Sequence, residues 1–214
     1  MQPGHFIHGF RRRMRTRRSE LPRFGSTGIM VIFIYAAYPS LLYGVATRQE
    51  KEMREERRVK VEELGGILKR IGTYSPATFG VSFTDRLTFQ KTIYLLQSFG
   101  LYLGYQFSWY IHGPYSTTLA KDGFKLIDTY NNAPIVKFTE QRDEHLFKKF
   151  LIFLGRRRND ANWLEILASI HILKKVNSTE TKANIINKVV DKDPHFRREI
   201  CEDAYEHLDK FGLI

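Results

Sequence analysis

Apolar side chains recur every three or four residues between positions 54 and 71, with charged residues between them. This spacing predicts an amphipathic helix over residues 54–71, whose apolar face carries Val61, Leu64, Leu68 and Ile71. Gly72 and Pro76 follow and are expected to end it, since neither residue continues a helix easily. The domain is therefore predicted to begin with a helix that packs through one face.

A second helix is predicted over residues 85–99. Thr84 is expected to be its N-cap, Asp85 lies near the positive end of the helix dipole, and Gly100 is expected to stop the helix. The C-terminal half of this helix is apolar on nearly all sides. A helix of that kind is predicted to be central and buried.

Gln90 and Lys91 are polar positions on this otherwise apolar helix, on the same face as Leu87 and Tyr94. Burying an ammonium group without a partner costs free energy. We therefore expect Lys91 either to reach solvent at an exposed rim or to pair with a carboxylate or with backbone carbonyls near residues 112–114.

Apolar and polar residues alternate through residues 101–116, with a break at Gly104. One parity holds Leu101, Leu103, Phe107, Trp109 and Ile111. This alternation predicts short extended segments, with Gly113-Pro114 as the corner. Ser116 or Thr117 is then expected to cap a helix through residues 119–127.

The remainder of the chain is predicted to be mostly helical. Residues 131–134 end the preceding helix, and residues 135–138 form a short strand or link. Thr139 is expected to cap a helix over residues 140–154. After a charged linker, three more helices are predicted at residues 162–174, 179–191 and 194–211, the last starting at Asp193-Pro194. The whole pattern predicts a mainly α fold with a short β-hairpin or extended segments.

The last three predicted helices follow a winged-helix order. Residues 211–214 resemble the start of a wing, and the sequence shows no wing hairpin after them, so we expect a winged-helix-like part without a complete wing. A nucleic-acid-binding role would use Arg156, Arg157, Arg158, Lys174, Lys175, Arg197 and Arg198. The final helix argues against that role, because it carries three basic and five acidic residues and would face phosphates.

Residues 1–52 differ from the rest of the chain. They hold nine Lys and Arg residues against three acidic ones, in a chain of 214 residues with a net charge of +11. Residues 24–47 carry no charge and could cross a bilayer as a helix, which needs about 20 residues. The preceding arginines would then hold the N-terminus in the cytoplasm. Two alternatives are a reading frame that truly starts at Met53 and a hydrophobic segment that packs into the domain.

We therefore divide the chain into an N-terminal extension, residues 1–52, and a helical domain, residues 53–214. Cys201 is the only cysteine, which excludes an internal disulfide and fits a reducing compartment. The predicted location is cytoplasmic, and membrane anchoring through residues 24–47 is the alternative.

Candidate catalytic and metal-binding groups are scattered along the chain. His195 and Glu199 are four residues apart, as are Asp203 and His207, and surface ion pairs explain both spacings without a metal. His112 lies near Ser116, but no carboxylate nearby in the sequence could orient the histidine. Gly65-Gly66 lacks the pattern of a phosphate-binding loop. The sequence therefore predicts no enzymatic activity, no metal and no cofactor.

Two segments, FQKTIYLLQ at residues 89–97 and FSWYIHGPYS at residues 107–116, resemble the Panacea domain of SocA-like antitoxins and, more closely, its YwgA-type prokaryotic relatives. In that group a lysine-containing helix that ends in a Tyr-Leu run is followed by an aromatic strand and a Gly-Pro turn. The matching positions are Lys91, Tyr94, Trp109, Gly113 and Pro114. The chain departs from the better-known antitoxins at Tyr115-Ser116 and in its N-terminal extension.

This resemblance covers residues 61–214. It implies a compact, mostly helical domain that works by binding a protein, in some members a toxin. The function predicted from the sequence is accordingly a non-catalytic protein-binding or regulatory domain, antitoxin-like in role. The alternative is a winged-helix-like DNA-binding transcriptional regulator that acts as a homodimer.

The corner at residues 113–114 has two candidate roles. Its polar groups could serve only to hold the turn, since buried polar atoms need partners. Alternatively, its aromatic side chains crown a cleft that receives a partner, because aromatics with polar tips are favoured at interfaces. The candidate partner-binding residues are Gln90, Lys91, Tyr94, Trp109, Tyr110, His112, Gly113, Pro114 and Tyr115.

Overall fold

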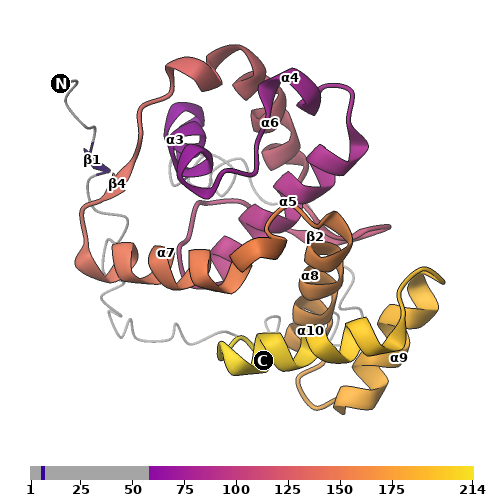
Figure 1. The fold of residues 1–214 in the computed structure, drawn as a ribbon. Helices are drawn as coiled ribbons and strands as arrows, with labels where there is room; N and C mark the ends of the chain where they lie inside the picture. The colour runs from indigo at the N-terminus through magenta and orange to yellow at the C-terminus, as the bar shows by residue number, and fades with distance from the viewer. Residues whose placement is uncertain (1–5, 8–57) are drawn as a thin grey trace, which may run out of the picture. The chain divides into compact units, whose positions relative to one another are not determined.

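The computed structural model describes residues 6–7 and 58–214 (Figure 1). The candidate membrane span at residues 24–47 and the proposed alternative start at Met53 lie outside the described residues. Among the helices of the described residues, none combines the length and the apolar character that crossing a bilayer requires. The described part is mainly helical with a small antiparallel hairpin, which confirms the predicted fold class.

The first helix of the described residues, α3, spans Val61–Ile71, so it begins later than the predicted residue 54. Residues 58–60 precede it in non-helical conformation, and the backbone N–H of Lys60 donates to the Glu63 carboxylate at 3.2 Å. Gly72 ends the helix in a left-handed conformation, as predicted. A Cβ atom on Gly66 would lie 2.0 Å from the carbonyl oxygen of Pro134, so the absence of a side chain allows this close packing.

A short helix, α4 at Pro76–Phe79, precedes the long helix α5 at Phe83–Ser98. The N-cap of α5 is Ser82, not Thr84: its hydroxyl accepts from the backbone N–H of Asp85 at 3.1 Å. The prediction was wrong by two residues because serine and threonine can both cap a helix, and serine, the better cap, comes first in the chain after α4. Residues 87–96 of α5 are all buried, which confirms its central position.

Helix α5 packs between helix α6, at Thr117–Thr129, and helix α8, at Ala161–Val176 (Figure 1). It also contacts the second strand of the hairpin. Ser116 caps α6, as predicted, because its hydroxyl accepts from the backbone N–H of Leu119 at 3.3 Å. The first turn of α6 is thereby fixed directly after the Gly-Pro corner.

The hairpin consists of strands β2, at Ser108–Tyr110, and β3, at Gly113–Tyr115. The strands are antiparallel, and Trp109 lies opposite Pro114. The chain reverses at residues 111–112, so the predicted corner at Gly113-Pro114 was placed two residues too late, and these two residues begin β3. A second, parallel pairing joins β1, at Phe6–Ile7, to β4, at Lys137–Phe138, within the predicted residues 135–138. A 3-10 turn at Tyr130–Asn132 connects α6 to this strand.

Helix α7 spans Gln141–Leu154, and its N-cap position is Glu140, so the predicted cap at Thr139 was one residue too early. A 3-10 turn at Gly155–Arg157 leads from α7 to α8. Asp160 caps α8 by accepting from the backbone N–H of Trp163 at 3.0 Å. Helix α8 is buried from residue 163 to residue 172, which makes it the second central helix of the domain.

Helix α9 spans Lys182–Lys192, with the Thr181 hydroxyl as its cap. Helix α10 spans Arg198–Lys210 and packs against both α8 and α9 (Figure 1). The predicted start at residue 194 was wrong. The Asp193 carboxylate accepts from the backbone N–H of His195 at 2.9 Å, and this local bond competes with helix formation. The winged-helix-like arrangement of these helices stays a prediction.

Candidate functional site

The ammonium group of Lys91 is inside the protein, with 1% of the residue exposed. Its Nζ donates a hydrogen bond to the carbonyl oxygen of Pro114 at 2.7 Å, which confirms the predicted pairing with a backbone carbonyl near the turn. Burial lowers the pKa of Lys91 to about 7; the carboxylate of Glu165 opposes this shift and the ammonium of Lys192 adds to it. Lys91 can therefore gain or lose a proton near neutral pH.

Gln90 fixes the chain just beyond the corner. Its side-chain amide donates to the carbonyl oxygen of Ser116 at 2.9 Å and accepts from the backbone N–H of Ser116 at 3.0 Å. Gln97, two helical turns later, uses its amide in the same way on the backbone of Leu103 and Tyr105. Two glutamines on one helix therefore hold the extended segment at both ends. The role of Gln97 was not predicted from the sequence.

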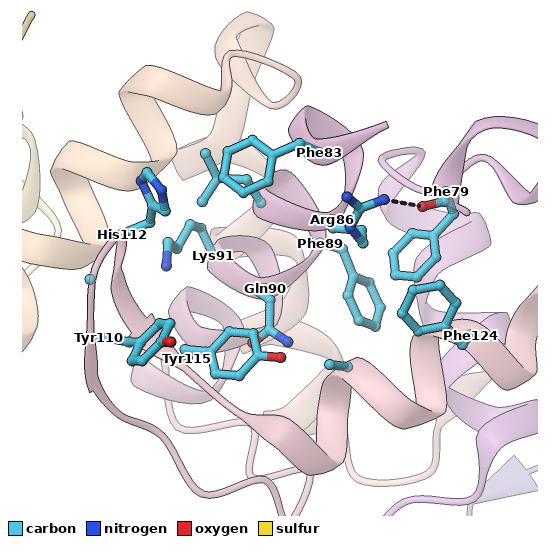
Figure 2. A pocket seen from close by; sticks show the side chains of 13 residues that line it. Phe79, Phe83, Arg86, Phe89, Gln90, Lys91, Tyr110, His112, Tyr115 and Phe124 are labelled. Atoms are coloured by element: carbon cyan, nitrogen blue, oxygen red, sulfur yellow. Dashed lines mark hydrogen bonds between the residues drawn. The ribbon is translucent and has the colours of Figure 1, made fainter. Parts of the chain in front are cut away.

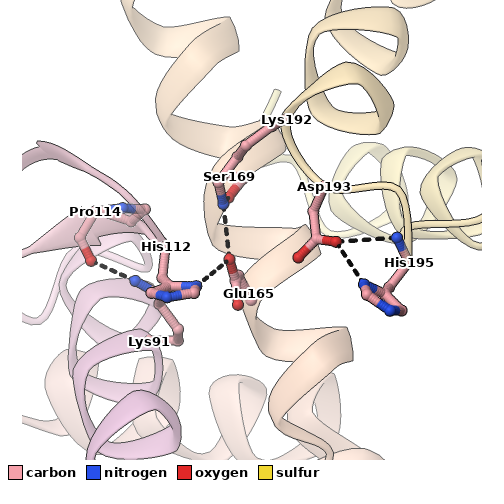
Figure 3. A network of polar contacts seen from close by, with 8 residues as sticks. All are labelled: Lys91, His112, Pro114, Glu165, Ser169, Lys192, Asp193 and His195. Carbon is pink, nitrogen blue, oxygen red and sulfur yellow. Dashed lines mark hydrogen bonds and ion pairs between the residues drawn. The ribbon is translucent and has the colours of Figure 1, made fainter.

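Glu165 of helix α8 is a buried carboxylate at the centre of a polar network (Figure 3). It accepts from Lys192 at 2.7 Å and lies 3.3 Å from Nδ1 of His112. Because a carboxylate only accepts, His112 carries its proton on Nδ1 in this contact. No carboxylate lies close to His112 in the sequence, and tertiary packing supplies one from 53 residues away.

Glu165 does not complete a catalytic triad. The hydroxyl of Ser116 caps helix α6 and is not the hydrogen-bond partner of His112. Ser169, on the same helix as Glu165, is fully buried, and its hydroxyl accepts from Lys192 at 3.4 Å. The network therefore connects α5, the corner, α8 and α9 without aligning a nucleophile with a base.

The hairpin divides the aromatic corner between two faces. Tyr110 and Tyr115 lie together, with ring centroids 5.6 Å apart. Trp109 belongs to the other face, where the ammonium of Lys192 lies 5.5 Å from its ring centroid. Successive side chains of a strand point to opposite faces, so Trp109 and Tyr110 cannot line the same cleft.

A pocket of about 280 Å³ opens beside Tyr110 and Tyr115 (Figure 2). Six of the predicted residues line it, namely Gln90, Lys91, Tyr110, His112, Gly113 and Tyr115. The other three predicted residues, Tyr94, Trp109 and Pro114, do not line it. The structure therefore brings most of the candidate residues to one cavity, although they come from a helix and from both sides of the corner.

The remaining wall of the pocket is aromatic and was not predicted. Figure 2 shows Phe79, Phe89 and Phe124 grouped at one end, and the ring of Phe79 packs edge-on against both others. Phe83 lies closer to His112, with ring centroids 5.0 Å apart. These phenylalanines come from α4, α5 and α6, and the apolar spacing of each helix gives no sign that the rings would meet.

Arg86 is the third basic residue of the pocket wall, with Lys91 and His112. Its Nη1 donates to the carbonyl oxygens of Phe79 and Gly80, both at 3.1 Å, and so caps the end of helix α4. Within the described residues, the lining of this pocket includes no Asp or Glu. Its walls are therefore aromatic and its ionisable groups basic or phenolic.

Tyr94 has a structural role in the core. Its hydroxyl lies 2.7 Å from Nδ1 of His171, and the tyrosine and the histidine are both buried. Burial lowers the pKa of His171 to about 4, and the charge of Lys175 contributes to the shift. The imidazole is therefore neutral at pH 7, as a buried partner of a phenol should be.

The histidines and the cysteine do not form a metal site in the described part of the chain, where no three His, Cys, Asp or Glu side chains come together. The predicted pairs on one helix are not made: His195 pairs with Asp193 and lies outside α10, and His207 bonds the carbonyl oxygen of Phe153. Cys201 is fully buried, and burial raises the pKa of its thiol to about 11.

The candidate nucleic-acid-binding residues are spread over the domain. Arg156–158 precede helix α8 and Lys174-Lys175 end it, so this helix of 16 residues separates them by about 24 Å. Arg157 pairs with Asp160, Arg158 donates to a backbone carbonyl of α3, and Lys174 to two carbonyls beyond α8. Near the start of α10, Arg197 is exposed and Arg198 donates to the side-chain carbonyl of Asn187. DNA binding stays a prediction, and within the described residues its candidate side chains lie at both ends of α8 and near the start of α10.

Comparison with known proteins adds no relative to this description. No family model, no curated protein and no solved structure matches the chain. The resemblance to the Panacea domain therefore stays a prediction carried by residues 89–97 and 107–116. What supports a function is the geometry of the pocket and of the polar groups behind it.

Proposed function

We propose that this chain is a non-catalytic binding domain that receives a segment of another protein in the pocket between helix α5 and the hairpin. The observation that carries this proposal is a group of exposed aromatic side chains around one cavity. Phe83, Tyr110 and Phe124 are 53%, 58% and 48% exposed and line the same pocket. Aromatic side chains bury large areas on association and dominate many protein interfaces.

The rigidity of the site also favours recognition of a partner. Lys91 bonds the carbonyl of Pro114 in strand β3, and Gln90 bonds the backbone of Ser116 directly after this strand, so the hairpin is held against a buried helix. A preformed pocket loses little conformational entropy when a partner binds. The resemblance to antitoxin domains points in the same direction, and a toxin is one partner that fits this role.

The test compares pocket variants with a matched aromatic control. Wild-type protein, the double variant Phe83→Ala/Tyr110→Ala and the single variant Trp109→Ala would each capture proteins from cells that express the chain. Trp109 neighbours Tyr110 and is 44% exposed, but it lies on the opposite face of the hairpin. We expect the same partner with wild type and Trp109→Ala, and its loss with the double variant.

Circular dichroism must show that all three proteins are folded. The proposal is contradicted if the double variant, folded, captures the same partner in the same amount as wild type. Loss of the partner with Trp109→Ala alone would move the binding surface to the opposite face of the hairpin, where Trp109 lies beside Lys192 of helix α9.

A further inference from the structure

Lys91 is an incompletely satisfied cation in the wall of the pocket. It lines the pocket, although the residue is only 1% exposed. An ammonium group has three N–H donors, and the described residues provide one acceptor, the carbonyl oxygen of Pro114. Buried donors without acceptors cost free energy. The ammonium therefore favours an additional acceptor that enters through the pocket.

Glu165 is the carboxylate whose charge favours the protonated form of Lys91, but it already has two other basic partners. Glu165 accepts from Lys192 and contacts His112, and it does not line the pocket. Within the described residues, the pocket has Arg86, Lys91 and His112 in its wall and no acidic residue. The basic residues of the pocket wall therefore favour the binding of one further negative group on the pocket side of Lys91.

The residues of the pocket wall indicate which other group of the partner binds beside the negative group. The wall around the basic residues is mostly aromatic, with Leu87 and Ala120 as its aliphatic residues and the rings of Phe79, Phe83, Phe89, Tyr110, Tyr115 and Phe124. Such a wall binds an apolar or aromatic side chain and excludes water, and a charge-assisted hydrogen bond is stronger where water is excluded. A free carboxylate without an apolar part would leave these rings uncovered.

We propose that the occupant is a segment of an acidic partner protein, which inserts an apolar or aromatic side chain among the rings and places the carboxylate of a neighbouring Asp or Glu against the ammonium of Lys91. This inference rests on the proposed binding function and specifies the partner chemistry. Charge complementarity carries it: a basic, ring-lined pocket without an acid fits an anionic segment with an apolar anchor.

Proton uptake on binding follows from this arrangement. The ionisable groups near Lys91 are Glu165 from α8, Lys192 from α9 and His112 from the turn, and Arg86 and the phenols of Tyr110 and Tyr115 share the pocket. Because the pKa of Lys91 is about 7, the Lys91 amine is neutral in most molecules of the unbound protein at pH 8. A carboxylate beside the amine favours its charged form, so binding at pH 8 should take up close to one proton.

The experiment measures binding of blocked peptides to the full chain by titration calorimetry at pH 8. One pair contains Phe followed by Asp or by Asn, and a second pair has the two residues in reverse order. The acidic peptide of at least one pair should bind at least about 10-fold more tightly than its amide counterpart. Titrations in phosphate and in Tris, which differ in ionisation enthalpy, should show proton uptake with that acidic peptide alone.

Lys91→Met tests whether Lys91 is the residue that binds the carboxylate and takes up the proton. It should bind the Asp and Asn peptides equally and show no proton uptake, while keeping affinity for the apolar side chain. If this variant does not fold, the comparison of the two peptides and two buffers on wild-type protein still decides the proposal.

The possible failures are distinguishable. Equal affinity of wild type for the Asp and Asn peptides of both pairs overturns the charge inference and leaves the proposed apolar pocket standing. Acid preference that persists in folded Lys91→Met assigns the carboxylate to another basic residue and overturns the role of Lys91. Binding of only a peptide with a free C-terminal carboxylate would replace the internal acidic segment with a chain terminus. The proposed function itself fails if the Phe83→Ala/Tyr110→Ala variant keeps its partner.

Discussion

Gly113 lies against Ser169 where the hairpin packs on helix α8. A Cβ atom added to Gly113 would lie 2.6 Å from Oγ of Ser169. The same Cβ position is 3.8 Å from Nζ of Lys91. Gly113 also has a φ of +79°, a conformation that costs residues with a side chain about 1 kcal/mol or more. The corner therefore requires glycine for two separate reasons.

Replacing Gly113 by alanine should lower the free energy of unfolding by about 2–3 kcal/mol, as the sum of backbone strain and overpacking. Gly72→Ala is the matched control, because Gly72 has a φ of +76° and its Cβ would meet only the side chain of Arg158 at 3.8 Å. The control should lose only about 1 kcal/mol. Urea denaturation followed by circular dichroism measures both.

The double variant Gly113→Ala/Ser169→Ala separates the two costs. Removing Oγ of Ser169 relieves the overpacking, so the double variant should recover more than half of the difference between Gly113→Ala and the Gly72→Ala control. No recovery in the double variant would show that backbone strain alone makes Gly113 necessary.

Lys91 should make stability depend on pH above neutrality. Its pKa is about 7 in the folded protein and 10.5 ordinarily, so between these values the unfolded chain binds more protons. Stability therefore rises with pH in this window. From pH 7 to pH 9, wild type should gain about 2 kcal/mol of unfolding free energy relative to Lys91→Met. Parallel urea denaturation curves at both pH values test this, and identical gains in the two proteins would contradict it.

Gln90 should contribute more to stability than an exposed glutamine of the same region. Gln90→Leu leaves the buried backbone N–H of Ser116 without its partner, while the carbonyl of Ser116 keeps its bond from the N–H of Ala120. The change should cost about 2 kcal/mol. Gln106 is exposed and its amide reaches only the hydroxyl of Tyr102 at 3.3 Å, so Gln106→Leu should change stability by less than about 0.5 kcal/mol. Equal effects in urea denaturation would remove the role given to Gln90.

Cys201 should be unreactive in the folded protein. The residue is fully buried, and burial raises the pKa of its thiol to about 11, so little thiolate is present at pH 8. Reaction with a chromogenic disulfide reagent should be at least about 100-fold slower in native buffer than in guanidinium chloride. Because this is the only cysteine of the chain, the signal reports on one site. Rapid reaction in native buffer would contradict the described packing of helix α10.

Local sequence pattern predicted the elements of the domain well where capping and periodicity act within a few residues. The buried helix α5 and the cap at Ser116 were both expected. The predicted corner was wrong in position, because the chain reverses at residues 111–112 and Gly113-Pro114 begin strand β3. The predicted start of helix α10 at residue 194 was wrong. The Asp193 side chain accepts from the backbone N–H of His195, and the helix begins only at Arg198. Propensity alone cannot decide between two such local hydrogen-bond patterns.

The sequence by itself determined that Lys91 must either reach solvent or pair with a group near residues 112–114, because burying an unpaired ammonium costs free energy. The structure decided for the pairing, with the carbonyl oxygen of Pro114. It could not determine that Glu165 and Lys192 would share its surroundings, since these residues are 74 and 101 positions further along the chain. Only the tertiary structure placed Tyr110 on the pocket face and Trp109 on the other, and assembled the phenylalanine wall from three helices. Periodicity specifies which face of an element is apolar, whereas the neighbour that each face meets depends on how all the elements pack together.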